Sequence, residues 1–83
     1  MINDMNIKQL HEKFETYFKD WDKESEEMKE LFGARDEDDV MFALYNVASI
    51  IGERKGWGEE GIGELQQQFI DELGIEDLEL SLD

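Results

Sequence analysis

The chain has 83 residues, a formal net charge of −15, and neither cysteine nor proline. Without cysteine there is no disulfide or thiolate metal site, and so acidic a chain is not expected to bind nucleic acid directly, which requires lysine and arginine against the phosphates. No apolar run approaches the roughly 20 residues of a membrane span, and residues 1–10 do not resemble a signal peptide. A single cytoplasmic domain over residues 1–83, with no membrane association, is therefore expected.

The first element is expected to be a long helix over residues 4–32, with Asn3 or Asp4 as its N-cap. Apolar residues recur every seven positions along it, at Ile7, Phe14, Trp21 and Met28. Such a stripe is typical of a helix face that packs against the rest of the protein. Gly33 is expected to end this helix in the left-handed conformation.

A second helix is predicted over residues 37–55, capped by Asp36 and ended by Gly56. Between residues 40 and 51 only Asn46 and Ser49 are polar. A helix that is apolar nearly all round is buried on most sides, and a chain of this length offers few neighbours to cover it. We therefore expect a homodimer in which a second subunit completes the packing.

The glycine-rich link 57–63 leads into a third predicted helix over residues 62–73, and the acidic tail 75–83 follows. The tail fits either a further helical turn or an alternating strand with Leu78, Leu80 and Leu82 on one side. The expected fold is thus all-α: an antiparallel helical hairpin plus a third helix, forming a small helical bundle that dimerisation completes.

Four carboxylates are arranged symmetrically about Gly33. Glu27 and Glu30 precede it with a spacing of three, and Asp36 and Asp39 follow it with the same spacing, so each pair shares a helix face. If Gly33 is the bend of the hairpin, Glu27 faces Asp39 and Glu30 faces Asp36. Four converging carboxylates predict a site for a hard divalent cation such as Mg²⁺. Glu26 adjoins the cluster, either as an outer ligand or as the base that takes a proton from water.

Two segments resemble the MazG-like all-α NTP pyrophosphohydrolases, and the resemblance covers about residues 18–52. DEDDVMFALYNVASIIG is similar to the core helix of that family, and KESEEMKEL is similar to its Lys followed by E-E-x-x-E-L. The matching residues are Lys23, Glu26, Glu27, Glu30, Leu31, Asp36, Asp39, Phe42, Ala43, Leu44, Asn46 and Ala48.

This resemblance implies Mg²⁺ binding by Glu27, Glu30, Asp36 and Asp39, and hydrolysis of a nucleoside triphosphate to a monophosphate and pyrophosphate by a dimer or tetramer. Lys23 and Asn46, at two matched positions, are expected to contact the nucleotide. The chain departs from the family in having Asp36 where glutamate is usual and no basic residue after Lys55. An inactive relative is therefore an alternative.

A second class of function follows from the charge. Residues 56–83 contain nine acidic residues and no basic one. Such a surface would attract a basic protein partner, as in a phage-type nucleic-acid mimic, an inhibitor, or a toxin-neutralising or adaptor protein, and would need no cofactor. The residues expected to bind that partner are Glu59, Glu60, Glu64, Asp71, Glu72, Glu76, Asp77 and Glu79.

Overall fold

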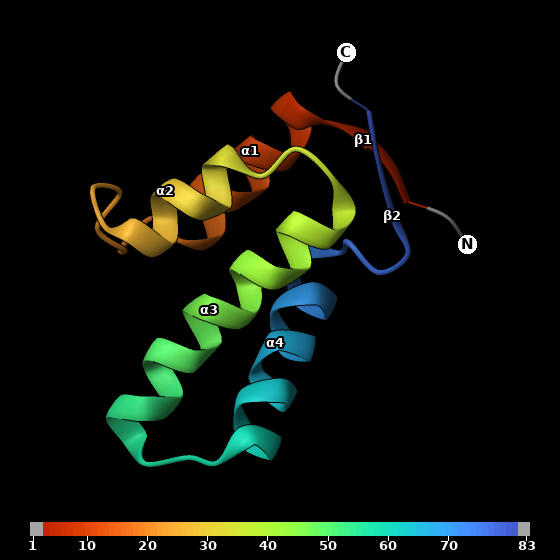
Figure 1. The fold of residues 1–83 in the computed structure, drawn as a ribbon. Coiled ribbons are helices and arrows are strands. Elements are labelled where there is room, and N and C mark those ends of the chain that lie inside the picture. The colour runs from red at the N-terminus through yellow and green to blue at the C-terminus, as the bar shows by residue number, and fades with distance from the viewer. Residues whose placement is uncertain (1–2, 82–83) are drawn as a thin grey trace.

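Helices dominate the structure, and a short sheet joins its two ends (Figure 1). The computed structural model describes residues 3–81. The helices are α1 (Ile7–Tyr17), α2 (Glu26–Gly33), α3 (Glu37–Lys55) and α4 (Glu59–Leu73), and the strands are β1 (Asn3–Asn6) and β2 (Leu78–Ser81). The expected all-α class is right for most of the chain, but it did not include the sheet.

The single helix expected over residues 4–32 is wrong, because turns over residues 18–25 separate α1 from α2. Side chains in this segment satisfy backbone groups that a continuous helix would use. The Asp22 carboxylate accepts the Glu24 N–H at 3.0 Å, and the Ser25 hydroxyl accepts the Met28 N–H at 3.4 Å. Ser25 is thus the N-cap of a new helix.

The N-cap of α1 is also different from the one expected. Asn6, not Asn3 or Asp4, holds this position, and its side chain accepts the Gln9 N–H at 2.8 Å. The Gln9 side chain accepts the Asn6 N–H at 2.9 Å in return, which completes a capping box. The helix begins at Ile7, and the residues before it are free to form a strand.

The predicted bounds of α3 are confirmed. Asp36 accepts the Asp39 N–H at 2.9 Å, and Gly56 ends the helix at φ 74°. The third predicted helix, α4, begins at Glu59 rather than Ile62, and its last residue is Leu73 as expected. Over residues 3–81, no helix is long and apolar enough to cross a membrane.

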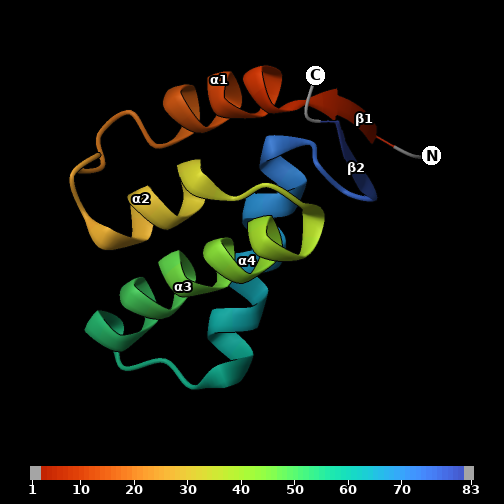
Figure 2. The same cartoon turned by 45° about the horizontal axis from the view of Figure 1, so that its top comes forward.

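α3 is the central element, since it contacts α2 on one side and α4 on the other (Figure 2). The core between the elements contains fully buried side chains from α1, α2, α3 and the segment after α4. The largest are Leu10, Phe14, Met28, Leu31, Leu44, Ile75, Val40 and Val47. The close approach of α3 and α4 depends on Gly52, where an added Cβ would lie 2.5 Å from Cγ1 of Ile62.

Most of the apolar surface of α3 is buried by its own chain. Val40, Ala43, Leu44, Val47, Ala48 and Gly52 are buried. Phe42 is exposed, at 66%, and Met41, Tyr45, Ile50 and Ile51 are half-buried. Because α2 and α4 cover α3, the buried residues of this helix need no second subunit to cover them. The homodimer stays a prediction that analytical ultracentrifugation would test.

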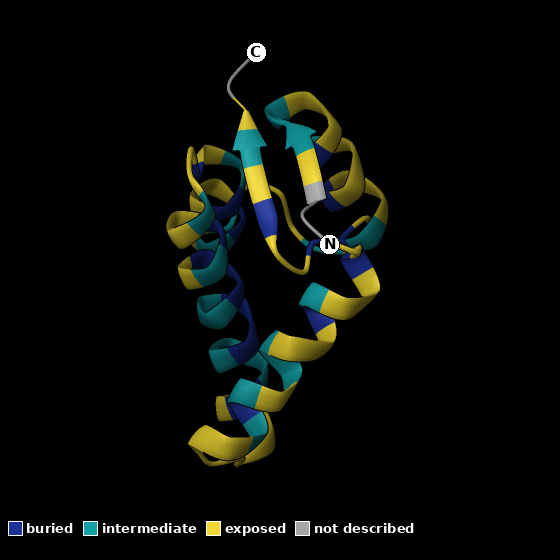
Figure 3. Cartoon of the chain, turned by 90° about the vertical axis from the view of Figure 1, so that its right-hand side faces the viewer, coloured by how far each residue is buried: buried dark blue, intermediate teal, exposed yellow. Residues whose placement is uncertain are grey.

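β1 and β2 pair in parallel, in a register that places Asp4 opposite Glu79 and Met5 opposite Leu80 (Figure 3). The strand alternative for the tail is right for residues 78–81, and Leu82 lies outside the described residues. Leu78 is buried, and Ile75 just before the strand is fully buried. The sheet therefore fixes the C-terminal segment to the helical body.

Candidate functional site

Two of the four predicted metal ligands, Glu30 and Asp39, lie at the same hollow between α2 and α3. The hollow has a volume of about 260 Å³ and is lined by Glu30, Gly33, Ala34, Asp39, Phe42 and Ala43. We call it the Phe42 hollow. Glu30 is held in place by Asn46, whose side-chain amide donates to its carboxylate at 2.8 Å. Asn46, expected to contact a nucleotide, thus contacts a predicted metal ligand.

Glu27 is oriented toward other partners. Its carboxylate accepts the Trp21 indole N–H at 3.2 Å, and it lines a separate hollow with Asp20, Asp22 and Arg54. A hydrogen bond from its own backbone N–H, with those from Trp21 and Ser25 and the charge of Arg54, holds the pKa of Glu27 below its usual range. Glu27 is accordingly a stable carboxylate at the N-terminus of α2.

The symmetric pairing about Gly33 is therefore not formed. Gly33 is the last residue of α2 and does not adopt a left-handed conformation. Glu30 meets Asn46, sixteen residues further on, so the two helices are staggered rather than mirror images about Gly33. Asp36 caps α3. Over residues 3–81, no group of three or more histidine, aspartate or glutamate side chains is placed to hold a metal ion.

The two remaining residues of the predicted catalytic set lie away from the Phe42 hollow. Lys23 is in the turn segment before α2 and lines a hollow with Glu15, Met28, Lys29, Phe32 and Gly33. Glu26 is exposed in the first turn of α2. Of the residues matched to the family, the structure brings Glu30, Asp39 and Asn46 together. Lys23 and Glu26 lie elsewhere.

The predicted partner-binding carboxylates are all exposed. They lie on α4 and on the segment from Gly74 into β2, namely Glu59, Glu60, Glu64, Asp71, Glu72, Glu76, Asp77 and Glu79. Glutamine amides on α4 donate to two of them, from Gln67 to Asp71 at 3.1 Å and from Gln68 to Glu72 at 3.3 Å. The outer face of α4 is thus acidic and rich in hydrogen-bond acceptors.

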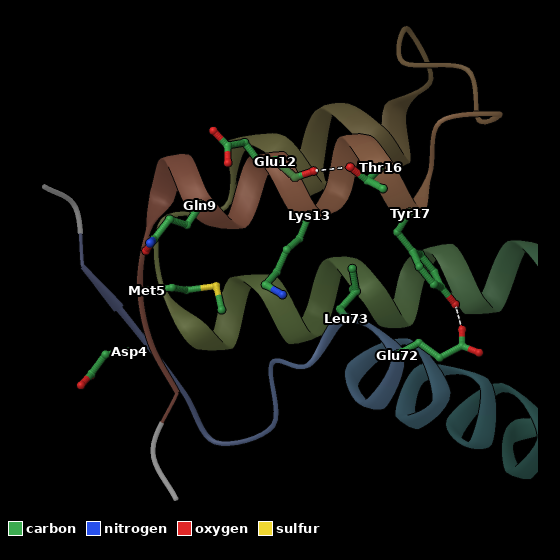
Figure 4. Close-up of a pocket in the computed structure, with 9 residues that line it drawn as sticks. All are labelled: Asp4, Met5, Gln9, Glu12, Lys13, Thr16, Tyr17, Glu72 and Leu73. Carbon is green, nitrogen blue, oxygen red and sulfur yellow. Dashed lines mark hydrogen bonds between the residues drawn. The ribbon is translucent and has the colours of Figure 1, made fainter.

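A larger hollow, of about 580 Å³, lies where β1, α1 and α4 meet (Figure 4). Lys13 extends from α1 into it between Met5 and Leu73, while the carboxylates of Asp4 and Glu12 point outward. The Tyr17 hydroxyl donates to Glu72 at its other end. Lys13 is thus the basic residue among the side chains that line this hollow, and the acidic ones are Asp4, Glu12 and Glu72.

Sequence reasoning missed two features next to this hollow. Burial, the hydrogen bond to Glu72 and the charge of Glu72 raise the pKa of Tyr17 to about 12, so Tyr17 is a neutral donor at ordinary pH. At the sheet, a hydrogen bond with Asp4 and the charges of Asp4 and Glu37 raise the pKa of Glu79. Nothing local in the sequence marks either pair, because the partners lie more than fifty residues apart.

Comparison of the chain with protein-family models, with curated proteins and with solved structures finds no match.

Proposed function

We propose that this chain is a non-catalytic binding protein that uses its acidic surface to bind a basic surface of another protein. The observation that supports this most directly is the exposure of all eight carboxylates on α4 and residues 76–79, in a region where no basic residue follows Lys55. No lysine or arginine within residues 56–83 offsets the negative charge that this segment presents to a partner.

Such a face favours association in two ways. A field of one sign steers an oppositely charged partner toward the surface and raises the association rate. Carboxylates at the interface then pair with the lysine and arginine of the partner. Proteins that bind nucleic acid carry surfaces rich in lysine and arginine. We therefore favour a phage-type nucleic-acid mimic or inhibitor that binds such a surface.

The proposal is tested with a fluorescently labelled arginine-rich peptide and anisotropy measured at increasing salt. We expect binding that weakens steeply as salt rises. Replacing Glu59, Glu60, Glu64 and Asp71 by their amides should weaken it most. The matched control replaces the exposed acids Glu12, Glu15, Asp20 and Glu24, which removes the same charge elsewhere. Equal losses in both variants, or binding insensitive to salt, would contradict a role for α4.

A second candidate is the Mg²⁺-dependent pyrophosphohydrolase that the sequence resembles. The observation in its favour is that Glu30 and Asp39 share one hollow, with Asn46 positioning Glu30. Mg²⁺ is commonly bound by one or two carboxylates together with substrate phosphates. Calorimetric titration with Mg²⁺ and a nucleoside triphosphate tests it, and Glu30→Gln and Asp39→Asn should each abolish the heat of binding. An unchanged titration in both variants would exclude this site.

A further inference from the structure

Phe42 is the most exposed large apolar side chain among the described residues, at 66%. It lies in the first half of α3, where Val40, Ala43 and Leu44 around it are buried. Aromatic residues, phenylalanine included, are enriched in protein–protein interfaces relative to the rest of the surface.

The Phe42 hollow has three kinds of wall. Part of its lining consists of small residues, namely Gly33, Ala34 and Ala43. A Cβ added at Gly33 would meet no other atom within 4 Å, so there is open space beside it. The ring of Phe42 forms an apolar side. Glu30 and Asp39, both exposed, provide carboxylates on the rim where α2 and the start of α3 lie side by side (Figure 2).

We propose that the Phe42 hollow binds the guanidinium group of an arginine from a basic partner. In this assignment the flat face of the guanidinium lies against the Phe42 ring, and its N–H groups donate to Glu30 and Asp39. Asn46 is a positioning residue, because its amide holds one oxygen of Glu30. The inference rests on the proposed function for its partner and names the residue type that the partner inserts.

Other occupants fit the walls less well. An apolar side chain would cover the two carboxylates without supplying donors of its own, and Asn46 donates to only one oxygen of Glu30, so the burial would be costly. A lysine would pair with the carboxylates, but its compact ammonium lacks the planar face and the fork of donors that arginine offers. A divalent cation takes six or more oxygen ligands, and over residues 3–81 no three acidic or histidine side chains are placed to hold one.

The test compares two synthetic peptides of equal length and charge, one rich in arginine and one in lysine, titrated into the full chain. We expect the arginine peptide to bind at least about threefold more tightly, since only guanidinium both stacks and donates in pairs. Phe42→Leu should weaken the arginine peptide about two- to fivefold and bring the ratio between the two peptides close to one. Glu30→Gln and Asp39→Asn should weaken both peptides.

Trp57→Leu is the matched control, because Trp57 is the other exposed large aromatic residue, at 41%. It should leave the arginine-to-lysine ratio unchanged. Backbone amide shifts in NMR spectra should move at Ala34 and Ala43 with the arginine peptide.

Binding of both peptides with equal affinity, unaffected by Phe42→Leu, would overturn the inference and leave the proposed function intact. Binding of neither peptide would overturn both. Displacement by Mg²⁺ beyond that of NaCl at equal ionic strength would overturn the inference in favour of a metal site.

Discussion

Tyr17 and Glu72 are fifty-five residues apart and share a hydrogen bond that links α1 to α4. The Tyr17 ring also packs edge-on against Phe18, with 4.9 Å between ring centroids, and against Phe69, with 5.8 Å. The hydroxyl is thus the polar group of a cluster of aromatic rings that is otherwise apolar. The hydrogen bond and the contact with Phe69 both join α1 to α4.

Tyr17→Phe removes the hydroxyl and keeps the ring. We expect the free energy of unfolding to fall by about 1 kcal/mol, the usual contribution of such a hydrogen bond. Urea denaturation measures it. Tyr45→Phe is the control, since Tyr45 is a half-buried tyrosine on α3. A Tyr17 variant as stable as the control variant would mean that water replaces the contact without loss.

The pKa of Tyr17 gives a prediction at alkaline pH. It is raised from 10.0 to about 12 in the folded chain, so the folded state holds the phenolic proton more tightly than the unfolded state. The resulting stability is complete below pH 10 and is lost as pH rises from 10 towards 12. Denaturation at several pH values should show wild type falling more steeply than Tyr17→Phe in this range. Parallel curves would contradict the assignment.

The Asp4 and Glu79 pair gives a prediction at acidic pH. The neighbouring carboxyl groups raise the pKa of Glu79, so its contribution to stability is present at low pH and is lost as pH rises through that raised value. At neutral pH the pair repels, and Glu79→Gln should therefore raise the melting temperature. The gain should shrink on acidification. Glu64→Gln on α4 is the control for the removal of one exposed charge, and an equal effect there would refute a specific pair.

Glu37 links the start of α3 to the sheet, because its carboxylate accepts the Leu80 N–H at 2.7 Å. That bond lowers the pKa of Glu37, so its contribution is present at neutral pH and is lost as pH falls. Glu37→Ala should speed hydrogen exchange at the Leu80 amide and leave exchange in the middle of α3 unchanged. Asp38→Ala is the neighbouring control. Unchanged exchange at Leu80 would show that this bond does not protect the strand.

Glycine substitutions test the packing of α3 on α4. Gly52→Ala would place a Cβ 2.5 Å from Ile62 and should destabilise the protein by about 1–3 kcal/mol, as overpacking does. Gly63→Ala lies inside α4, where an added Cβ meets nothing within 4 Å, and should stabilise by about 0.5–1 kcal/mol through helix propensity. Thermal denaturation of both variants would reveal the sign of each change.

The helix that sequence described best is α3, since its signals are local. Asp36 and Gly56 mark its two ends, and both act as expected. The break between α1 and α2 was hidden because the apolar stripe continues across it: Phe18 is buried and Trp21 is half-buried in the turn segment. Asp22 and Ser25 were the available signal, as polar residues whose side chains compete with a helix for backbone hydrogen bonds.

The sheet and the site were harder to predict because they depend on distant pairings. The alternation of Leu78 and Leu80 was visible, but its partner strand lies at the other end of the chain. The prediction that four carboxylates converge required a symmetric bend at Gly33. The stagger that places Glu30 beside Asn46 comes from packing between whole helices, which spacing around one glycine does not determine.

The parallel sheet has a mechanical consequence. All four described helices lie between β1 and β2 in the chain, and the strands run in the same direction. Tension applied at Asn3 and at Ser81 would pull the two strands past each other along their length, so their backbone hydrogen bonds would be loaded together in shear. The pulling force would therefore unfold the helices only after the hydrogen bonds between β1 and β2 have broken.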